Sequence, residues 1–285
     1  MTDYSILNPS GNITALVTTP VEIPLQPETA ARIMRKHPDV EQVGFVSFED
    51  PEKTGIHASL RMAGGEFCGN ASMCAAALSV LDSPYLSAAN VPGSSAALRL
   101  RVSGAADPLN VTLHKEHENT FSAGIKMPPA SDPEETAFAF HDLSGFIPCV
   151  RMDGIYHMII ENDSPFAMLK DRPDLAEQAV RDLCGRLNAD GLGLMFLLRD
   201  SSAPSQYHLT PLVYVPSGNT IFWEHSCASG SAATAMYLAK KAGTPVSLTF
   251  MEPGGILRAE SDPLSGTTYL FGNVSLTARY SSSIA

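Results

Sequence analysis

Several features that mark other protein classes are missing from this 285-residue sequence. It has no apolar run near the about 18 residues that a membrane-spanning helix needs, and its first residues lack the basic and apolar segments of a signal peptide. Basic residues are also scarce, because 19 lysines and arginines stand against 30 acidic residues for a net charge of −11. We therefore expect a cytoplasmic protein that binds neither nucleic acid nor membranes.

Motifs for metals and phosphates are missing as well. The sequence has no Cys-x-x-Cys pair, no His-x-x-x-His cluster, no Walker-type loop and no strand–GxGxxG–helix unit. Its five cysteines are an odd number without a dense framework, which is more typical of free thiols in a cytoplasmic chain than of structural disulfides. We expect no metal site and no cofactor.

Two stretches stand out among what is present. Residues 64–78 and 224–238 each place a cysteine, Cys68 or Cys227, where a Gly-containing polar turn gives way to a run of small, helix-tolerant residues. This pattern predicts a cysteine at the N-terminus of a buried helix, where unpaired N–H groups and the helix dipole lower a thiol pKa and attract anions. Two such helices facing each other would place two acid–base thiols around one bound carboxylate.

The same order of elements surrounds both cysteines: strand, helix, strands, cysteine turn, small-residue helix, strands. We infer an internal duplication within one chain. The Pro- and acid-rich stretch 127–135 is the best candidate boundary. The predicted domains are an N-terminal lobe, 1–130, completed by a C-terminal strand around 268–285, and a C-terminal lobe, 131–267.

A buried structural role is the alternative for any single cysteine, because cysteine is among the most buried residue types. The matched positions of Cys68 and Cys227 in two matched halves favour the functional interpretation. Cys74 falls on an Ala-rich helix face, and Cys149 and Cys184 have no partner feature, so we interpret these three as structural.

Two motifs resemble a known group of enzymes. Glu66-Phe67-Cys68-Gly69-Asn70-Ala71 looks like the first active-site motif of the diaminopimelate epimerase superfamily, and Cys227-Ala228-Ser229-Gly230-Ser231-Ala232 looks like its second. The resemblance implies an α/β (mixed α+β) fold of two pseudo-symmetric lobes. Each lobe would be a β-barrel-like sheet around a central helix, with the active site in the interlobe cleft.

The resemblance also implies cofactor-independent racemisation of a small amino-acid substrate. One thiolate, from Cys68 or Cys227, would remove the α-proton, and the other thiol would deliver a proton to the opposite face. Backbone N–H groups at both helix starts could stabilise the carboxylate as it takes up charge. The predicted substrate-binding residues are Asn12, Glu41, Gly69, Asn70, Glu224, Ala228, Ser229 and Gly230. For Asn12 the alternative is a turn residue, and for Glu224 a carboxylate favoured by the helix dipole.

The identity of the substrate depends on departures from the epimerase pattern. Diaminopimelate epimerases carry a Glu-Arg pair before the second cysteine, whereas here His225 follows Glu224. Glu41, in Val40-Glu41-Gln42-Val43, resembles an acidic residue of the histidine racemases of staphylopine-type metallophore pathways, so we expect L- and D-histidine to be interconverted. Alternatives are a same-fold isomerase using Glu41 on a non-amino-acid substrate, a racemase or epimerase of proline or diaminopimelate, and a binding protein without chemistry. The oligomeric state stays open, with a homodimer among the options.

Overall fold

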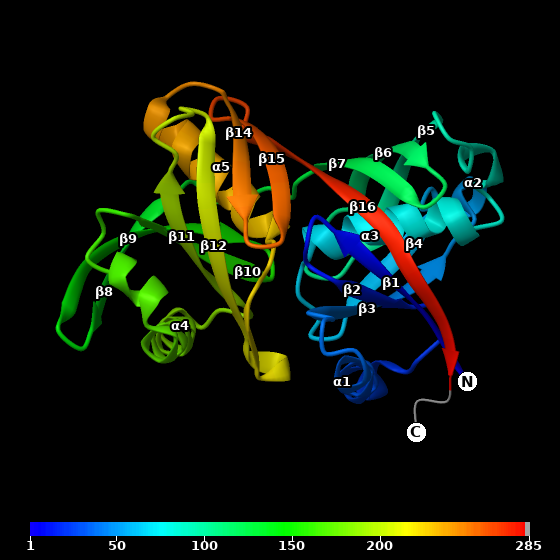
Figure 1. Cartoon of the computed structure of the whole chain (residues 1–285), viewed down its shortest axis with the longest axis horizontal. Helices are drawn as coiled ribbons and strands as arrows, with labels where there is room; N and C mark the ends of the chain where they lie inside the picture. The colour runs from blue at the N-terminus through cyan, green and yellow to red at the C-terminus, as the bar shows by residue number, and fades with distance from the viewer. Residues whose placement is uncertain (283–285) are drawn as a thin grey trace. The chain divides into compact units, whose positions relative to one another are not determined.

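The chain folds into two compact units (Figure 1), seen in a computed structural model that describes residues 1–282. The N-terminal unit comprises Met1–Lys126 and Phe271–Ala285, and the C-terminal unit comprises Met127–Leu270. The strand β16 (Thr267–Ser282) begins in the C-terminal unit and continues in the N-terminal unit. Of the strand expected around 268–285, residues 283–285 lie outside the described residues.

Eight strands close into a ring in the N-terminal unit. They neighbour one another in chain order from β1 to β7, followed by β16, and β16 pairs back onto β1. The β2–β3 and β4–β5 pairs are parallel. Closure leaves the ring without a free edge. Its first seven strands are β1 (Thr2–Pro9), β2 (Thr14–Val17), β3 (Gln42–Phe48), β4 (Ala58–Met62), β5 (Ser95–Val102), β6 (Leu109–His117) and β7 (Thr120–Lys126).

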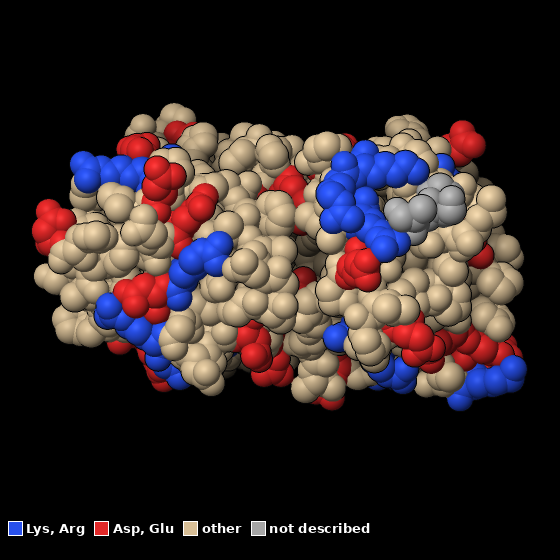
Figure 2. Space-filling view, turned by 90° about the horizontal axis from the view of Figure 1, so that it is seen from below, with Lys and Arg blue, Asp and Glu red and all other residues tan. Residues whose placement is uncertain are grey.

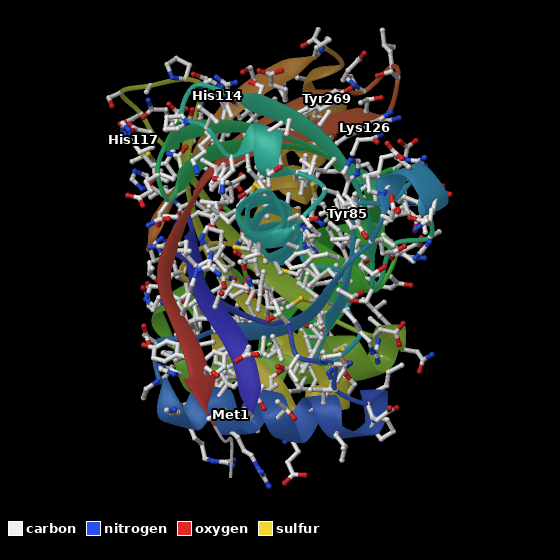
Figure 3. All side chains as sticks on the ribbon, turned by 90° about the vertical axis from the view of Figure 1, so that its right-hand side faces the viewer. Met1, Tyr85, His114, His117, Lys126 and Tyr269 are labelled. Carbon is white, nitrogen blue, oxygen red and sulfur yellow. The ribbon has the colours of Figure 1, made fainter. Side chains whose placement is uncertain are left out.

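Helix α3 (Gly69–Asp82) is the core of this unit and packs against strands β1 to β7. Every residue from Gly69 to Val80 is buried, and most are Ala, Ser or Gly. A helix that is apolar or small on all sides belongs inside a protein, and small side chains let the surrounding strands approach it. Figure 3 looks at this unit with β1 and β16 side by side, and it shows exposed His114 and His117 of β6 at the rim.

Helix α1 (Gln26–Lys36) packs on the outside of the ring against β3. It buries Ala30 and Ile33 and carries Arg35 and Lys36 in its last turn, where the helix dipole favours cations. A short helix, α2 (Pro51–Thr54), lies between β3 and β4. Acidic and basic side chains are interspersed on the face shown in Figure 2.

The C-terminal unit repeats this plan. Its strands are ordered β8-β9-β10-β11-β12-β14-β15, with β13 paired to β12. Helix α5 (Ala228–Ala242) packs against β9, β10, β11, β14 and β15, and α4 (Pro173–Leu187) packs against β11 and β12. The strands are β8 (Glu134–Phe140), β9 (Leu143–Met152), β10 (Ile155–Glu161), β11 (Leu192–Arg199), β12 (Gln206–Val215), β13 (Thr220–Trp223), β14 (Val246–Glu252) and β15 (Gly255–Asp262).

The duplication expected from the sequence is present in the topology. The order β1-β2-α1-β3-β4-α3-β5-β6 corresponds to β9-β10-α4-β11-β12-α5-β14-β15. The parallel pairs β10–β11 and β12–β14 correspond to β2–β3 and β4–β5. The predicted mixed fold, with two similar lobes each built around a central helix, is confirmed. No helix within residues 1–282 has the length and apolar character to cross a membrane.

Candidate active site

Cys68 occupies the N-cap of α3. Its backbone is extended (φ −138°, ψ 113°), and its Sγ accepts a hydrogen bond from the Ala71 N–H at 3.3 Å. The Ser72 hydroxyl donates to the Cys68 carbonyl at 2.7 Å. The side chain is half-buried. The sequence-based placement of Cys68 at a helix N-terminus is therefore correct.

A relay of hydrogen bonds fixes the Cys68 thiol. The thiol donates to Gln42 Oε1 at 2.9 Å, and Gln42 Nε2 donates to the Thr14 hydroxyl oxygen at 2.7 Å. The Thr14 hydroxyl donates to the carbonyl of Asn12 at 3.0 Å. The parallel register of β2 and β3 pairs Thr14 with Gln42, so the sheet itself positions the relay.

The predicted residues Asn12 and Glu41 lie at the starts of the two strands that carry this relay. Asn12 is buried in the turn between β1 and β2, and Glu41 is half-buried directly before β3. The Glu41 N–H donates to the Ile13 carbonyl at 2.9 Å. Sequence reasoning selected Glu41 and missed Gln42, the neighbouring residue whose side chain contacts the thiol.

The turn after β5 holds the loop that leads to Cys68. The Ser103 hydroxyl donates to the Glu66 carbonyl at 2.8 Å and accepts from the Met62 N–H at 3.0 Å. Gly104 has φ +70°, and a Cβ there would lie 2.2 Å from the Phe67 nitrogen. Only glycine fits such a close approach in this conformation. Burial raises the pKa of the Glu66 carboxyl, although the charge of Arg61 partly offsets this rise.

Cys227 occupies the corresponding N-cap of α5 and is buried (φ −127°, ψ 100°). Its side chain does not cap the helix; instead, a carboxylate from β14 does so. Glu252 Oε2 accepts the Cys227 N–H at 2.5 Å, and Oε1 accepts the Ser231 hydroxyl. Burial raises the pKa of Glu252 to about 8. Neither Glu252 nor Ser231 was predicted, and the only local hint was an acidic residue ahead of a Pro-Gly-Gly turn.

The Cys227 thiol has a pKa well above its usual value. Burial is the largest cause, and the negative charges of Glu224 and Glu252 add to it. Glu224 also accepts a hydrogen bond from the thiol, whereas the Gly230 N–H lowers the pKa only weakly. The expectation that a helix N-terminus lowers the thiol pKa is therefore wrong for Cys227, because desolvation and two carboxylates outweigh the dipole.

A buried histidine lies beside the first turn of α5. His157 Nε2 is hydrogen-bonded to the Ser229 hydroxyl at 2.9 Å, and that hydroxyl lies 3.7 Å from Cys227 Sγ. Burial lowers the pKa of His157 to about 3, so the imidazole is neutral at ordinary pH. Within residues 1–282 its Nδ1 has no hydrogen-bond partner. His157 is the counterpart of Thr14 in the repeated unit. Thr14 pairs with Gln42 of the parallel strand β3, and His157 pairs with Gly193 of the parallel strand β11.

The remaining predicted residues lie around the two N-caps. Glu224 is half-buried after β13, and its N–H donates to the Pro211 carbonyl at 3.0 Å. Five predicted residues form the buried first turns of the two central helices, namely Gly69, Asn70, Ala228, Ser229 and Gly230. These turns present backbone N–H groups that suit a carboxylate.

Comparisons with known proteins agree with this arrangement. The model of the family described as histidine racemase CntK N-terminal domain matches residues 1–279. A histidine racemase of Fusobacterium nucleatum subsp. nucleatum (strain ATCC 23726) is 31% identical over 84% of this chain and 81% of its own length. A histidine racemase of Staphylococcus aureus is 26% identical over 82% of this chain and 79% of its own length.

The fold has counterparts among solved structures. The crystal structure of a probable proline racemase from Agrobacterium radiobacter K84 superposes with a TM-score of 0.72 at 10% identity. That match covers 100% of this chain and 94% of the other, so the similarity in fold includes both units. Because the family match spans nearly the whole chain and includes both cysteine-capped helices, the chain belongs to the histidine racemase family of isomerases.

Proposed function

We propose that this protein interconverts L- and D-histidine without a cofactor, with Cys68 and Cys227 acting on opposite faces of the α-carbon. One observation carries the proposal: each cysteine occupies the N-cap position of the central helix in one of two units with the same order of elements. A symmetric reaction needs two acid–base groups of one kind, because each serves as base in one direction and as acid in the other.

The two thiols together account for both proton transfers. In one direction the Cys68 thiolate takes the α-proton and becomes a thiol, while the Cys227 thiol gives its proton to the opposite face and becomes a thiolate. The electron pair left on the α-carbon spreads onto the substrate carboxylate. N–H groups at the first turns, from Gly69 and Asn70 and from Ala228 to Gly230, would stabilise that charge. The reverse direction exchanges the roles of the two thiols.

The surroundings of Cys227 suit a resting state in which its thiol is protonated. The thiol is buried beside Glu224 and Glu252. Negative charge near a thiol favours its protonated form. We therefore assign Cys227 as the acid in the free enzyme and Cys68 as the base.

Histidine as the substrate rests on the family and on two carboxylates. Glu41 directly precedes Gln42, which contacts the Cys68 thiol, and Glu224 lies beside the Cys227 thiol. Glu41 and Glu224 would accept hydrogen bonds from the substrate ammonium or imidazole, which are charge-assisted and therefore strong. His225 stands where diaminopimelate epimerases carry an arginine, so a second charged centre on the substrate would be unpaired in a dry site at considerable cost.

The test is turnover of L-histidine, L-proline and diaminopimelate, measured side by side in D2O. Proton NMR follows loss of the α-proton signal, and chiral chromatography follows inversion. We expect exchange and inversion of histidine alone, and loss of histidine turnover in Glu41→Gln. Fast proline or diaminopimelate turnover with inert histidine would overturn the substrate assignment. Cys184→Ser is the matched control, since Cys184 is buried on α4 and its thiol donates to the Ala189 carbonyl.

A further inference from the structure

Glu252 is an unusual carboxylate in this protein. Within residues 1–282 it is the one acidic residue that is buried as a whole, at 8% exposure. It ends β14, and both of its oxygens are used at the start of α5. The mechanism described above assigns it no step, although it touches the backbone of Cys227.

In the N-terminal unit, the residue that corresponds to Glu252 is not a carboxylate. In both units, the turn after the strand holds the residue two places before the cysteine. After β5, the Ser103 hydroxyl donates to the Glu66 carbonyl. After β14, the Gly254 N–H donates to the His225 carbonyl at 2.7 Å. The buried residues of β5, which end with Leu100 and Val102, match those of β14, which end with Phe250 and Glu252, so Val102 is the counterpart of Glu252. Cys68 caps its own helix through the Ala71 N–H.

We propose that Glu252 is the positioning residue for Cys227: its carboxyl holds the Cys227 backbone at the helix start, and its negative charge keeps the Cys227 thiol protonated at alkaline pH. This inference rests on the proposed two-thiol racemisation. It also assigns a role to Ser231, which holds the second oxygen of Glu252.

The surroundings of Glu252 contain few other charges. Glu224 is the group whose charge adds to the effect of burial on Glu252. On β15 the residue opposite Glu252 is Gly255, and on β12 the exposed His208 is paired with the preceding residue, Met251. Glu252 therefore ionises near pH 8, before the Cys227 thiol does, and its new charge delays loss of the thiol proton.

The first experiment titrates the thiolate directly and needs no turnover. Ultraviolet absorbance of thiolate is recorded against pH for the wild type and Cys227→Ser, and the difference isolates Cys227. The same pair is measured in a Glu252→Gln background. We expect the Cys227 midpoint to fall by roughly one pH unit without the carboxylate. An unchanged or higher midpoint would overturn the proposal. Glu252→Met, uncharged and of similar length, serves if the Gln variant does not fold.

The second experiment measures histidine racemisation against pH. In Glu252→Gln the alkaline limb of kcat/KM should move to lower pH, because no negative charge develops beside the Cys227 thiol. The acid limb of the profile should stay in place. Because L- and D-histidine have equal free energies, kcat/KM is equal in both directions, and the informative quantity is the pH at which it falls.

Two control variants distinguish the effect of the position of the Glu252 carboxyl from the effect of its charge. Glu252→Asp keeps the charge but withdraws the carboxyl from the Cys227 N–H, so it should lower kcat and leave the alkaline limb in place. Ser231→Ala removes only the hydroxyl partner and should leave the Cys227 midpoint high. If the wild type racemised no amino acid, the proposed function would fail, yet the thiolate titration would still decide the role of Glu252.

Discussion

Gly230 is the position where a single methyl group should separate stability from activity. It is the third residue of α5, and a Cβ there would lie 2.2 Å from Met195 Sδ and 3.1 Å from Cys227 Sγ. The corresponding residue of α3 is Ala71, and the strand residue corresponding to Met195 is Gly44. The N-terminal unit thus pairs a helix alanine with a strand glycine, whereas the C-terminal unit pairs a helix glycine with a strand methionine. Gly230→Ala therefore tests packing rather than helix propensity.

The expected magnitudes follow from opposing terms. Overpacking a filled core costs about 1–3 kcal/mol, while replacing a helical glycine by alanine returns about 1 kcal/mol. Gly230→Ala should thus lower stability by only about 1 kcal/mol, or a few degrees in Tm. Activity should fall far more, because a displacement of Cys227 of about 1 Å can cost about 100-fold in rate.

Thermal unfolding and histidine racemisation of four proteins test this reasoning: the wild type, Gly230→Ala, Met195→Ala and the double variant. Met195→Ala opens the space that the new methyl needs, so the double variant should recover much of the lost kcat despite its poorer packing. Gly185→Ala on α4 is the control, since a Cβ there meets nothing within 4 Å and should stabilise the chain. Wild-type kcat in Gly230→Ala, or no recovery in the double variant, would refute the reasoning.

Three further predictions concern the thiols and their neighbours. Cys68→Ser and Cys227→Ser should each abolish inversion in the chiral assay, since a serine hydroxyl is too weak an acid; near-wild-type inversion in either would exclude two-thiol catalysis. Gln42→Met removes the acceptor for the Cys68 thiol and the donor to Thr14, so racemisation should fall, with about 1–3 kcal/mol lost in denaturant unfolding; unchanged kcat would show that the relay is structural only. His157 has a folded pKa of about 3, below its unfolded value near 6.5, so its contribution to stability is complete above about pH 6.5 and is lost as pH falls toward 3. His157→Gln should flatten the acid side of the curve of Tm against pH, and an unchanged slope would contradict a buried neutral imidazole.

Some strands left only a weak local pattern in the sequence. The strands β1, β7, β8 and β9 were not predicted, because they mix buried and exposed residues or follow a Pro-rich stretch that reads as a linker. Their pairing depends on partners distant in the chain, as when β1 pairs with both β2 and β16. Short amphipathic strands become recognisable once those partners are known.

What the sequence determined by itself is the pair of cysteine-capped central helices and their duplication. A polar turn, a cysteine and a run of small residues are local features, and local features decide where a buried helix begins. What only the tertiary structure decided is the set of groups around each thiol. Gln42 is 26 residues from Cys68, and Glu252 is 25 residues from Cys227, so strand register alone brings them to the thiols. The raised pKa of Cys227 has the same origin, because desolvation and nearby carboxylates depend on packing and not on sequence neighbours.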